Sequence, residues 1–342
     1  MSSLPYLEIS APVIKYGVAL TLCINSFLIY VTNNHIKTIN TAYKFLIVLE
    51  ASLGILFSLI EILITPFIHS YNASFIYFSS TSATSKSLII RLILLSAYSL
   101  TYMVIICGLA IQFIYRYLVV LAPKSLKWFR GWRATVWIVY GSVFSVIWVA
   151  GLNQMLPDDY SKKYVGREME KNYGFDVDHL ASYQLVAYDN QGQMRFHNCL
   201  GLSTLTTILT FQYVIVLFFG IKTHFGIKSI VAVTSTKAHR LHTQLFKTLV
   251  LQITVPTVFY NSPVFLMYLS PYLDMKYSFP SGLMILCFNF YPAVDSLILM
   301  WMVGEYHRVI KKLVGSIVTI LLRWSETKTV DDTTDGMNNQ RI

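Results

Sequence analysis

The sequence contains few charged residues. Only 13% of its 342 positions are Asp, Glu, Lys or Arg, about half the share found in soluble domains. Hydrophobic residues make up 55%, and the mean hydropathy is +0.54. They form unbroken blocks instead of recurring at amphipathic spacing. These features exclude a large soluble core and indicate an integral membrane protein.

Cysteine is scarce, with four residues in the whole chain. Cys23, Cys107 and Cys287 fall inside apolar runs, where a free thiol behaves as a small apolar group. Cys199 lies where a long polar loop meets a later run, and it has no evident partner on that side of the membrane. We therefore predict that the chain has no structural disulfide.

Several signatures of catalysis and transport are missing. The membrane-buried segments contain no histidine cluster, no metal-ligand spacing, no Gly-x-Ser-x-Gly and no paired-aspartate motif. An intramembrane enzyme, a metal site and a bound cofactor are therefore not predicted. The two halves of the chain also show no matching interrupted helices, which disfavours a transporter built from inverted repeats.

Seven long apolar runs are present. Each can cross a hydrocarbon core of about 30 Å, which takes about 20 helical residues. The sequence therefore predicts an all-α membrane protein, a bundle of seven transmembrane helices with its termini on opposite sides. The runs are Ala11–Val31, Ala42–Ile68, Leu88–Leu121, Gly131–Met155, Leu200–Ile221, Gln244–Ser270 and Pro280–Val303.

Basic residues indicate the orientation, because loops rich in Lys and Arg are retained in the cytoplasm. With the N-terminus outside, the cytoplasmic segments hold 18 of the 27 Lys and Arg residues. Most of the net charge of +10 then lies in the cytoplasmic segments, where it forms a basic collar around the bundle. Topology and attraction to anionic membrane lipid explain this collar without a nucleic-acid partner.

The chain divides into four segments. Residues 1–10 are predicted to be an extracellular N-terminus, and residues 11–303 form the seven-transmembrane domain. Residues 304–324 place apolar side chains at helical spacing opposite a basic face, which predicts an amphipathic helix along the inner membrane surface. Residues 325–342 are polar, lack aromatics and are predicted to be a disordered cytoplasmic tail.

The long outer loop 156–199 carries seven carboxylates and several tyrosines. It shows no apolar periodicity of its own, and we expect it to form a lid over the mouth of the bundle. Asn72 begins the sequon Asn72-Ala73-Ser74 in the first outer loop, on the side where glycosylation takes place.

Three carboxylates lie inside apolar runs, where ionisable side chains are costly and indicate function. A rise of about 1.5 Å per residue places Asn25, Glu50 and Asp295 at a similar depth in the inner half. We hypothesise that Glu50 and Asp295 share a proton or bind sodium and so form a latch that biases inactive against active packing. Two neighbouring carboxylates in low dielectric cannot both stay ionised without a counter-charge. The alternative is that backbone or hydroxyl groups satisfy each carboxylate separately.

The third carboxylate, Glu61, lies eleven residues after Glu50, which is about three helical turns and therefore the same face. It lies toward the outer half of the second run. Two roles are open for it, contact with a ligand or pairing with Arg91 near the outer end of the third run. Pairing is the favoured of the two.

The third and sixth runs carry features typical of moving parts. Arg116 sits at the inner boundary of the third run, where a guanidinium either snorkels or is held inside the closed bundle. Pro256 and Pro263, two turns apart, predict kinks in the sixth run. The basic Lys237–Lys247 segment lies at its inner end. We therefore interpret the sixth helix as the one that moves on activation.

Short motifs follow one another in a specific order along residues 15–312. They are Asn25-Ser26-Phe27-Leu28-Ile29-Tyr30, Tyr43-Lys44, Phe113-Ile114-Tyr115-Arg116-Tyr117, Gln244-Leu245-Phe246-Lys247-Thr248-Leu249-Val250-Leu251-Gln252 followed by Pro256, and Tyr291-Pro292-Ala293-Val294-Asp295-Ser296-Leu297 with Tyr306 and Arg308 downstream. None is decisive alone. Their order and spacing together resemble the nematode seven-transmembrane chemoreceptors of the Str type, which belong to the G-protein-coupled receptors.

The resemblance implies an odorant or other small chemical ligand, coupling to a heterotrimeric G protein, and residence in the plasma membrane of sensory neurons, in their cilia. It likens Tyr115-Arg116-Tyr117 to the arginine motif at the inner end of the third helix. It likens Pro292 to Asp295 to the proline-polar motif of the seventh helix, in which Pro292 is expected to kink the helix.

Three departures from the family pattern bear on activation. Ser296 stands where a proline usually follows the seventh-helix aspartate, which softens a kink. No acidic residue directly precedes Arg116, so the usual local ion pair is absent. The outer end of the third run has no cysteine, so the disulfide common in other G-protein-coupled receptors is not expected. We expect family membership together with an activation geometry that differs from the conventional one.

The predicted mechanism is a population shift in which a ligand enters beneath the 156–199 loop and favours one helix packing over another. The sixth helix then moves and opens an inner cleft to the G protein. Arg116, the loop 122–130 and the segment 222–247 line this cleft, including the basic residues Lys237, Arg240 and Lys247. Aromatic lining suits a small volatile molecule. The predicted ligand-binding residues are Glu61, Tyr98, Tyr102, Phe259, Tyr260 and Phe288.

Two other functions stay open at this point. A proton or cation carrier that uses Glu50, Glu61 and Asp295 predicts current or flux in cells that lack G proteins. A ligand-gated odorant channel of the insect kind has the opposite orientation, with its N-terminus inside, so an N-terminal tag accessible on intact cells argues against it.

Overall fold

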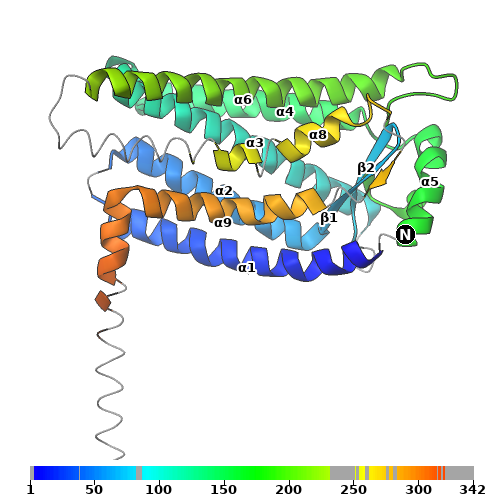
Figure 1. The fold of residues 1–342 in the computed structure, drawn as a ribbon, viewed down its shortest axis with the longest axis horizontal. Helices are drawn as coiled ribbons and strands as arrows, with labels where there is room; N and C mark the ends of the chain where they lie inside the picture. Colours follow the sequence, from blue (N-terminus) through cyan, green and yellow to red (C-terminus); the bar gives the residue numbers. More distant parts are fainter. Residues whose placement is uncertain are drawn as a thin grey trace, which may run out of the picture.

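The computed structural model describes residues 4–37, 39–81, 87–231, 251, 254–258, 262–274, 277–279, 283–313, 315, 316 and 319. Within these residues the chain is a bundle of long helices, with a small sheet and a short helix covering one end (Figure 1). The predicted helix bundle is confirmed. The sheet is an addition that the sequence analysis does not predict.

Five helices in the described part of the chain are long and apolar enough to cross a membrane. Helix α9 and the helix that follows it pass this test only together, and they are bent by 92° relative to each other, so they make a sixth candidate span. The predicted run Gln244–Ser270 is described only in part, mainly as α8. The bounds are α1 Leu4–Asn34, α2 Thr41–Ile64, α3 Leu88–Leu121, α4 Thr135–Asn153, α6 Phe196–Val231, α8 Ser262–Leu269 and α9 Leu283–Met302.

Helix α3 occupies the centre of the bundle. It contacts α2, α4 and α6, and Figure 1 shows it crossing between the α4–α6 pair and the layer of α1, α2 and α9. Half of its apolar span is buried, against 22% for the span that contains α4. Helix α3 therefore forms the core, whereas α4 presents most of its surface outward, as a lipid-facing helix does.

Three separate loops join in one antiparallel sheet with the strand order β3-β2-β1-β4. The end of the bundle that carries this sheet is called the outer end below. The predicted run Ala42–Ile68 is too long at its end, because Thr65 turns left-handed with φ 40° and Pro66 starts a strand. The strands are β1 Pro66–Tyr71, β2 Ser74–Ser79, β3 Ser182–Val186 and β4 Ser278–Phe279.

The loop 156–199 forms structure of its own. The expectation that it lacks apolar periodicity is wrong, because Val165, Met169 and Tyr173 recur every four residues. These side chains are buried against Phe67 and Phe78 of the sheet. Figure 1 shows the resulting helix beside the sheet at the outer end. The elements of the loop are α5 Asp159–Tyr173, a 3-10 turn Val177–His179 and β3.

The start of the chain also differs from the prediction. Helix α1 begins at Leu4, so most of the segment 1–10 continues the first span instead of forming a separate tail. This end lies at the outer end of the bundle, beside the sheet, whereas the helix after α9 lies at the opposite end (Figure 1).

The chain turns sharply after α9. The helix Gly304–Leu313 buries Tyr306 completely and exposes Arg308 and Lys311. The hydroxyl of Tyr306 lies 2.8 Å from that of Thr32 on α1, which fixes the bend against the bundle. This one-sided burial agrees with the amphipathic helix predicted for 304–324, whereas 325–342 lie outside the described residues.

Candidate functional site

A small cavity of about 50 Å³ lies at the outer end, between the sheet and the helices. Three of the predicted ligand-binding residues, Tyr98, Tyr102 and Phe288, belong to its wall. Phe259 and Tyr260 lie outside the described residues. The wall consists of Ile68, Phe75, Tyr77, Tyr98, Ser99, Tyr102, Trp148, Leu152, Met155, Leu205, Val264, Met267, Tyr268 and Phe288.

Aromatic rings dominate this wall. The ring of Tyr102 lies 5.9 Å from that of Trp148 and 5.5 Å from that of Phe288, measured between centroids. The indole N–H of Trp148 donates to the hydroxyl of Ser99 at 2.8 Å, so the one donor of this side chain is already used. A cavity with this lining suits a small and mainly apolar molecule.

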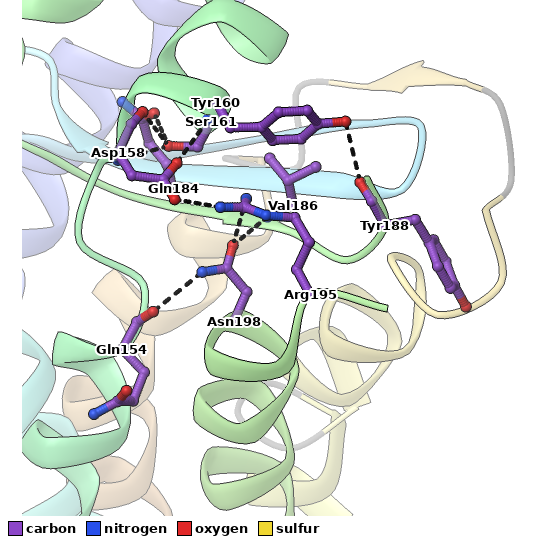
Figure 2. Close-up of polar contacts among 9 residues, drawn as sticks. All are labelled: Gln154, Asp158, Tyr160, Ser161, Gln184, Val186, Tyr188, Arg195 and Asn198. Carbon is purple, nitrogen blue, oxygen red and sulfur yellow. Dashed lines mark hydrogen bonds and ion pairs between the residues drawn. The ribbon is translucent and has the colours of Figure 1, made fainter. Parts of the chain in front are cut away.

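Polar contacts at the start of α6 tie the lid loop to the bundle, as Figure 2 shows. The guanidinium of Arg195 forms an ion pair with Asp158 and donates to the amide oxygen of Asn198 at 3.1 Å. Asn198 also accepts from the backbone N–H of Val186 and donates to the carbonyl of Gln154. One network therefore joins the end of α4, the strand β3 and the start of α6.

Asp158 keeps its charge in this network. Partial burial acts to raise the pKa of the Asp158 carboxyl, but hydrogen bonds from Ser161 and the nearby Arg195 guanidinium outweigh it and hold the pKa below its usual range. Tyr160 adds a second contact, with its ring centroid 4.7 Å from the guanidinium carbon of Arg195. The lid is therefore anchored by a charged pair and by a cation–π contact.

His69 connects strands and a helix from all three outer loops. Its Nδ1 lies 2.9 Å from the hydroxyl of Tyr173 on α5, and its Nε2 lies 3.3 Å from the hydroxyl of Ser278 on β4 and 3.5 Å from Glu168 Oε1 on α5. Burial lowers the pKa of His69, and the Glu168 carboxylate opposes this without cancelling it. The imidazole is therefore neutral at neutral pH.

Acidification is expected to weaken the sheet around His69. The pKa of His69 is lower in the folded lid than in an unfolded chain, so the unfolded form binds more protons and stability falls as the pH drops below about 6.5. Hydrogen exchange of the β1 and β2 amides, corrected for the intrinsic effect of pH, should therefore quicken on acidification. His69→Gln is expected to remove this dependence. Equal corrected exchange of the wild type at about pH 7.5 and about pH 5 would refute the assignment.

At the inner end, the structure brings the predicted polar layer together from three helices. Asn25 of α1 donates to the carbonyl of Ala51 on α2 at 3.1 Å, and its amide oxygen accepts from the hydroxyl of Ser296 on α9 at 2.7 Å. Gly54 permits this close approach, because a Cβ there would lie 2.7 Å from Asn25 and 2.8 Å from Pro292. The serine that replaces the expected proline therefore supplies a hydrogen bond between helices.

Glu50 and Asp295 line one cavity of about 30 Å³ in this layer. Gln112 of α3 donates a hydrogen bond to Glu50, and the two carboxyl groups interact electrostatically. Gly108 leaves room for Glu50, because a Cβ there would lie 1.8 Å from its Oε1. The cavity is large enough for a water molecule, and the latch stays a prediction. No group of three His, Cys, Asp or Glu that could hold a metal occurs among the described residues.

Arg116 is held by a tyrosine of α2 and attracts a carboxylate of α9. Its Nη2 and Nε donate to the hydroxyl of Tyr43 on α2 at 2.8 and 3.2 Å, and its charge attracts the carboxylate of Asp295 on α9. The hydroxyl of Tyr43 is therefore the hydrogen-bond partner of Arg116, which has no acidic residue directly before it in the sequence. Tyr115 stacks on Tyr43 at 5.3 Å, and Tyr117 packs its ring against α6.

Glu61 has a different partner from the one predicted. Its Oε2 accepts a hydrogen bond from the amide of Asn289 on α9 at 3.0 Å, at a fully buried position. Arg91 instead donates to the carbonyls of Thr81 and His179. The predicted Glu61–Arg91 pair is therefore wrong. Glu61 is not part of the wall of the outer cavity, and its contact with a ligand stays a prediction.

The predicted kinks fall on three kinds of backbone. Pro292 lies inside α9, and Pro256 is buried in the short described segment 254–258, where a π-type turn follows it. Pro263 stands in the first turn of α8, a position that tolerates proline. The predicted coupling residues Lys237, Arg240 and Lys247 lie outside the described part of the chain.

Asn72, the first residue of the predicted glycosylation sequon, lies in a turn and contacts the helix of the long outer loop. Asn72 occupies the turn between β1 and β2 with φ 48°, and its side chain is hydrogen-bonded to Tyr164 of α5. Attachment of a glycan there stays a prediction.

All four cysteines are free, and the thiol of Cys199 is buried against the carbonyl of Ala187.

The roles of three contributors to these sites were not predicted from the sequence. Gln112 is polar, lies in an apolar run and precedes Arg116 by four residues, so helical spacing alone could have identified it. Asn289 is likewise a polar residue inside the seventh run. Tyr43 belongs to the Tyr43-Lys44 motif, but no role was predicted for it, because the chain contains 23 tyrosines and most intramembrane ones serve packing.

The chain is similar to known receptors over most of its length. A family model described as the serpentine type seven-transmembrane G-protein-coupled chemoreceptor Str matches residues 12–311. The G-protein coupled receptor str-33 of Caenorhabditis elegans is 36% identical over 313 residues, which cover 90% of this chain and 91% of that receptor. The serpentine receptor class r-10 of the same species is 26% identical over 299 residues, covering 86% and 87%.

Proposed function

The chain belongs to the Str family of serpentine seven-transmembrane chemoreceptors, and on this premise we propose that it detects a small odorant and signals through a heterotrimeric G protein. Membership makes it a multi-pass membrane protein of a G-protein-coupled receptor family and not of an enzyme family. We place it in the plasma membrane of a sensory neuron, in the cilium, with its N-terminus outside.

One observation supports the proposal above the others: the outer cavity and the Arg116 contact stand on the same two helices. Helix α3 carries Tyr102 in the cavity and Arg116 at the inner end, about 21 Å apart at 1.5 Å per residue. Helix α9 carries Phe288 in the cavity and Asp295, whose carboxylate attracts Arg116, about 10 Å apart. A ligand that moves either helix therefore acts on the inner contact directly.

The ligand acts by its different affinity for two packings of the bundle. Binding against Phe288 displaces the outer part of α9 about Pro292, where the helix lacks a backbone hydrogen bond. Asp295 then moves relative to Arg116, and the guanidinium leaves Tyr43 and turns toward the cytoplasm. The opened cleft, which also includes the loop 122–130 and the segment 222–247, receives the G protein.

A reporter screen tests this function. Cells that express the chain with a calcium or cAMP reporter are exposed to panels of volatile and water-soluble compounds. Arg116→Ala is expected to lower any evoked response at least tenfold at equal surface expression, because the residue that contacts the G protein is lost. Arg167→Ala, which removes an exposed arginine of α5, should leave the response unchanged.

Three results would count against the proposal. A response that survives Arg116→Ala would reject Arg116 as the coupling site. Ligand-evoked current or flux in cells without G proteins would favour a carrier or a channel. An N-terminal tag that is accessible only after permeabilisation would reverse the orientation on which the cytoplasmic cleft depends.

A further inference from the structure

A large groove runs along the outward side of α2, α3 and α4, apart from the outer cavity and the Arg116 contact. Its volume is about 1280 Å³, and its walls are mainly apolar. Phe45, Ile138 and Val146 line it and are each at least 64% exposed. Because these helices cross the membrane, the groove opens onto the hydrocarbon of the bilayer, where an acyl chain is the available occupant.

Glycines give this groove its shape. Gly141 on α4 lines it, and no atom lies within 4 Å of the position that a Cβ would occupy there. Gly108 on α3 lines it as well, beside Glu50. The wall therefore recedes at the middle of the groove, where larger residues would fill the space. This provides a position at which the groove can be blocked without a clash inside the protein.

Basic side chains gather at the inner end of the groove. The connection between α3 and α4 consists of two 3-10 turns, Pro123–Phe129 and Gly131–Ala134, with Arg130 between them. Arg130 lines the groove and also an adjoining surface hollow. The other basic residues of this hollow are Lys124, Lys127 and Arg133.

The charges around the groove are nearly all of one sign. Glu50 is the sole carboxylate among the residues that line the groove or the hollow, and it lies in the wall formed by the helices, away from the basic turns. Trp132, which lines the hollow, is 79% exposed, as is typical of tryptophan at the membrane–water interface. The basic cluster therefore lies at headgroup depth and the apolar trough at acyl-chain depth.

From this combination we infer that the groove is a specific binding site for one anionic phospholipid of the leaflet that faces the α3–α4 connection. The acyl chain lies along α2, α3 and α4, past Gly141. The phosphate lies against Arg130, with Lys127 beside it. A zwitterionic lipid fills the same trough but gains less from the cations, each of which contributes about 1 kcal/mol toward an anionic surface.

The site adjoins the inner polar layer. Glu50 lines both the groove and the small cavity that it shares with Asp295. An acyl chain in the groove therefore covers the side of Glu50 that faces the membrane and excludes water from it. The lipid site does not depend on the proposed ligand or on G-protein coupling, because it is defined by direct binding.

Native mass spectrometry of the purified full-length chain tests the inference. The protein is delipidated in detergent and offered equal amounts of phosphatidylserine and phosphatidylcholine with identical acyl chains. The wild type is expected to retain one phosphatidylserine in preference to phosphatidylcholine. Arg130→Gln should lower this retention about fivefold, the factor that corresponds to about 1 kcal/mol. Gly141→Leu should lower it by a similar or larger factor, because the side chain fills the trough.

Arg308→Gln is the matched control, since it removes an exposed arginine from the inner amphipathic helix and lies outside the groove. It should leave retention unchanged. Equal retention of the two lipids by the wild type would overturn the inference, as would an equal loss in Arg308→Gln and Arg130→Gln, which shows general charge attraction. Unchanged retention in Gly141→Leu would also overturn it, because the acyl chain then lies elsewhere.

Discussion

Gly108→Ala is expected to destabilise the folded receptor by about 1–3 kcal/mol, the cost of leaving a buried carboxyl group without its hydrogen bond. The new Cβ would lie 1.8 Å from Oε1 of Glu50, so the carboxylate must leave its place. The hydrogen bond that Gln112 donates to Glu50 is then lost within the bundle. The midpoint of thermal unfolding in detergent measures the change.

Gly141→Ala provides the control for this prediction. It makes the same substitution on α4, but no atom lies within 4 Å of the new Cβ. Alanine favours a helix by up to about 1 kcal/mol over glycine, so the control is expected to be neutral or slightly stabilising. The double variant Gly108→Ala with Glu50→Ala should regain part of the lost stability. Equal unfolding midpoints for Gly108→Ala and Gly141→Ala would contradict the described packing of Glu50.

Asp295→Asn is expected to raise signalling in the absence of ligand about tenfold. Asparagine keeps the volume of the side chain but removes the charge that attracts Arg116, leaving Tyr43 as the hydrogen-bond partner described for it. A coupling of about 1.4 kcal/mol between helices corresponds to this factor. G-protein nucleotide exchange with purified receptor measures the effect and requires no knowledge of the ligand.

Glu50→Gln separates the two charges of the proposed latch. It removes the like charge near Asp295 and mimics a protonated Glu50. The electrostatic attraction between Asp295 and Arg116 is therefore kept. Basal exchange should therefore stay at or below the wild-type level. If Glu50→Gln and Asp295→Asn each leave basal and stimulated signalling unchanged, the latch between the two carboxylates is wrong.

Helical periodicity explains why the inner site could be predicted. Asn25, Glu50 and Asp295 were placed at one depth by counting residues from the ends of apolar runs, and the structure brings them into one layer. The α3 bounds, Leu88–Leu121, also agree with the predicted run. Long apolar segments have a fixed rise and a fixed period, so depth and face follow from the sequence.

Partners on other helices could not be predicted in the same way. The rotation of each helix against its neighbours depends on packing, which is why Glu61 bonds to Asn289 and not to Arg91. The sheet was missed because its strands pair residues far apart in sequence, such as Ser70 with Phe279. Pro66–Tyr71 also continues the apolar second run, and a short apolar segment does not distinguish a helix end from a strand.

We propose that Arg116, which is held by Tyr43 and attracts Asp295 in the closed bundle, is the group that engages the G protein. The direct measurement is nucleotide exchange by purified G protein with Asp295→Asn receptor and with the double variant Asp295→Asn, Arg116→Ala, at equal amounts of folded protein. We predict that the first raises exchange about tenfold and that the second returns it to the level without receptor. Exchange that stays raised in the double variant would contradict the claim.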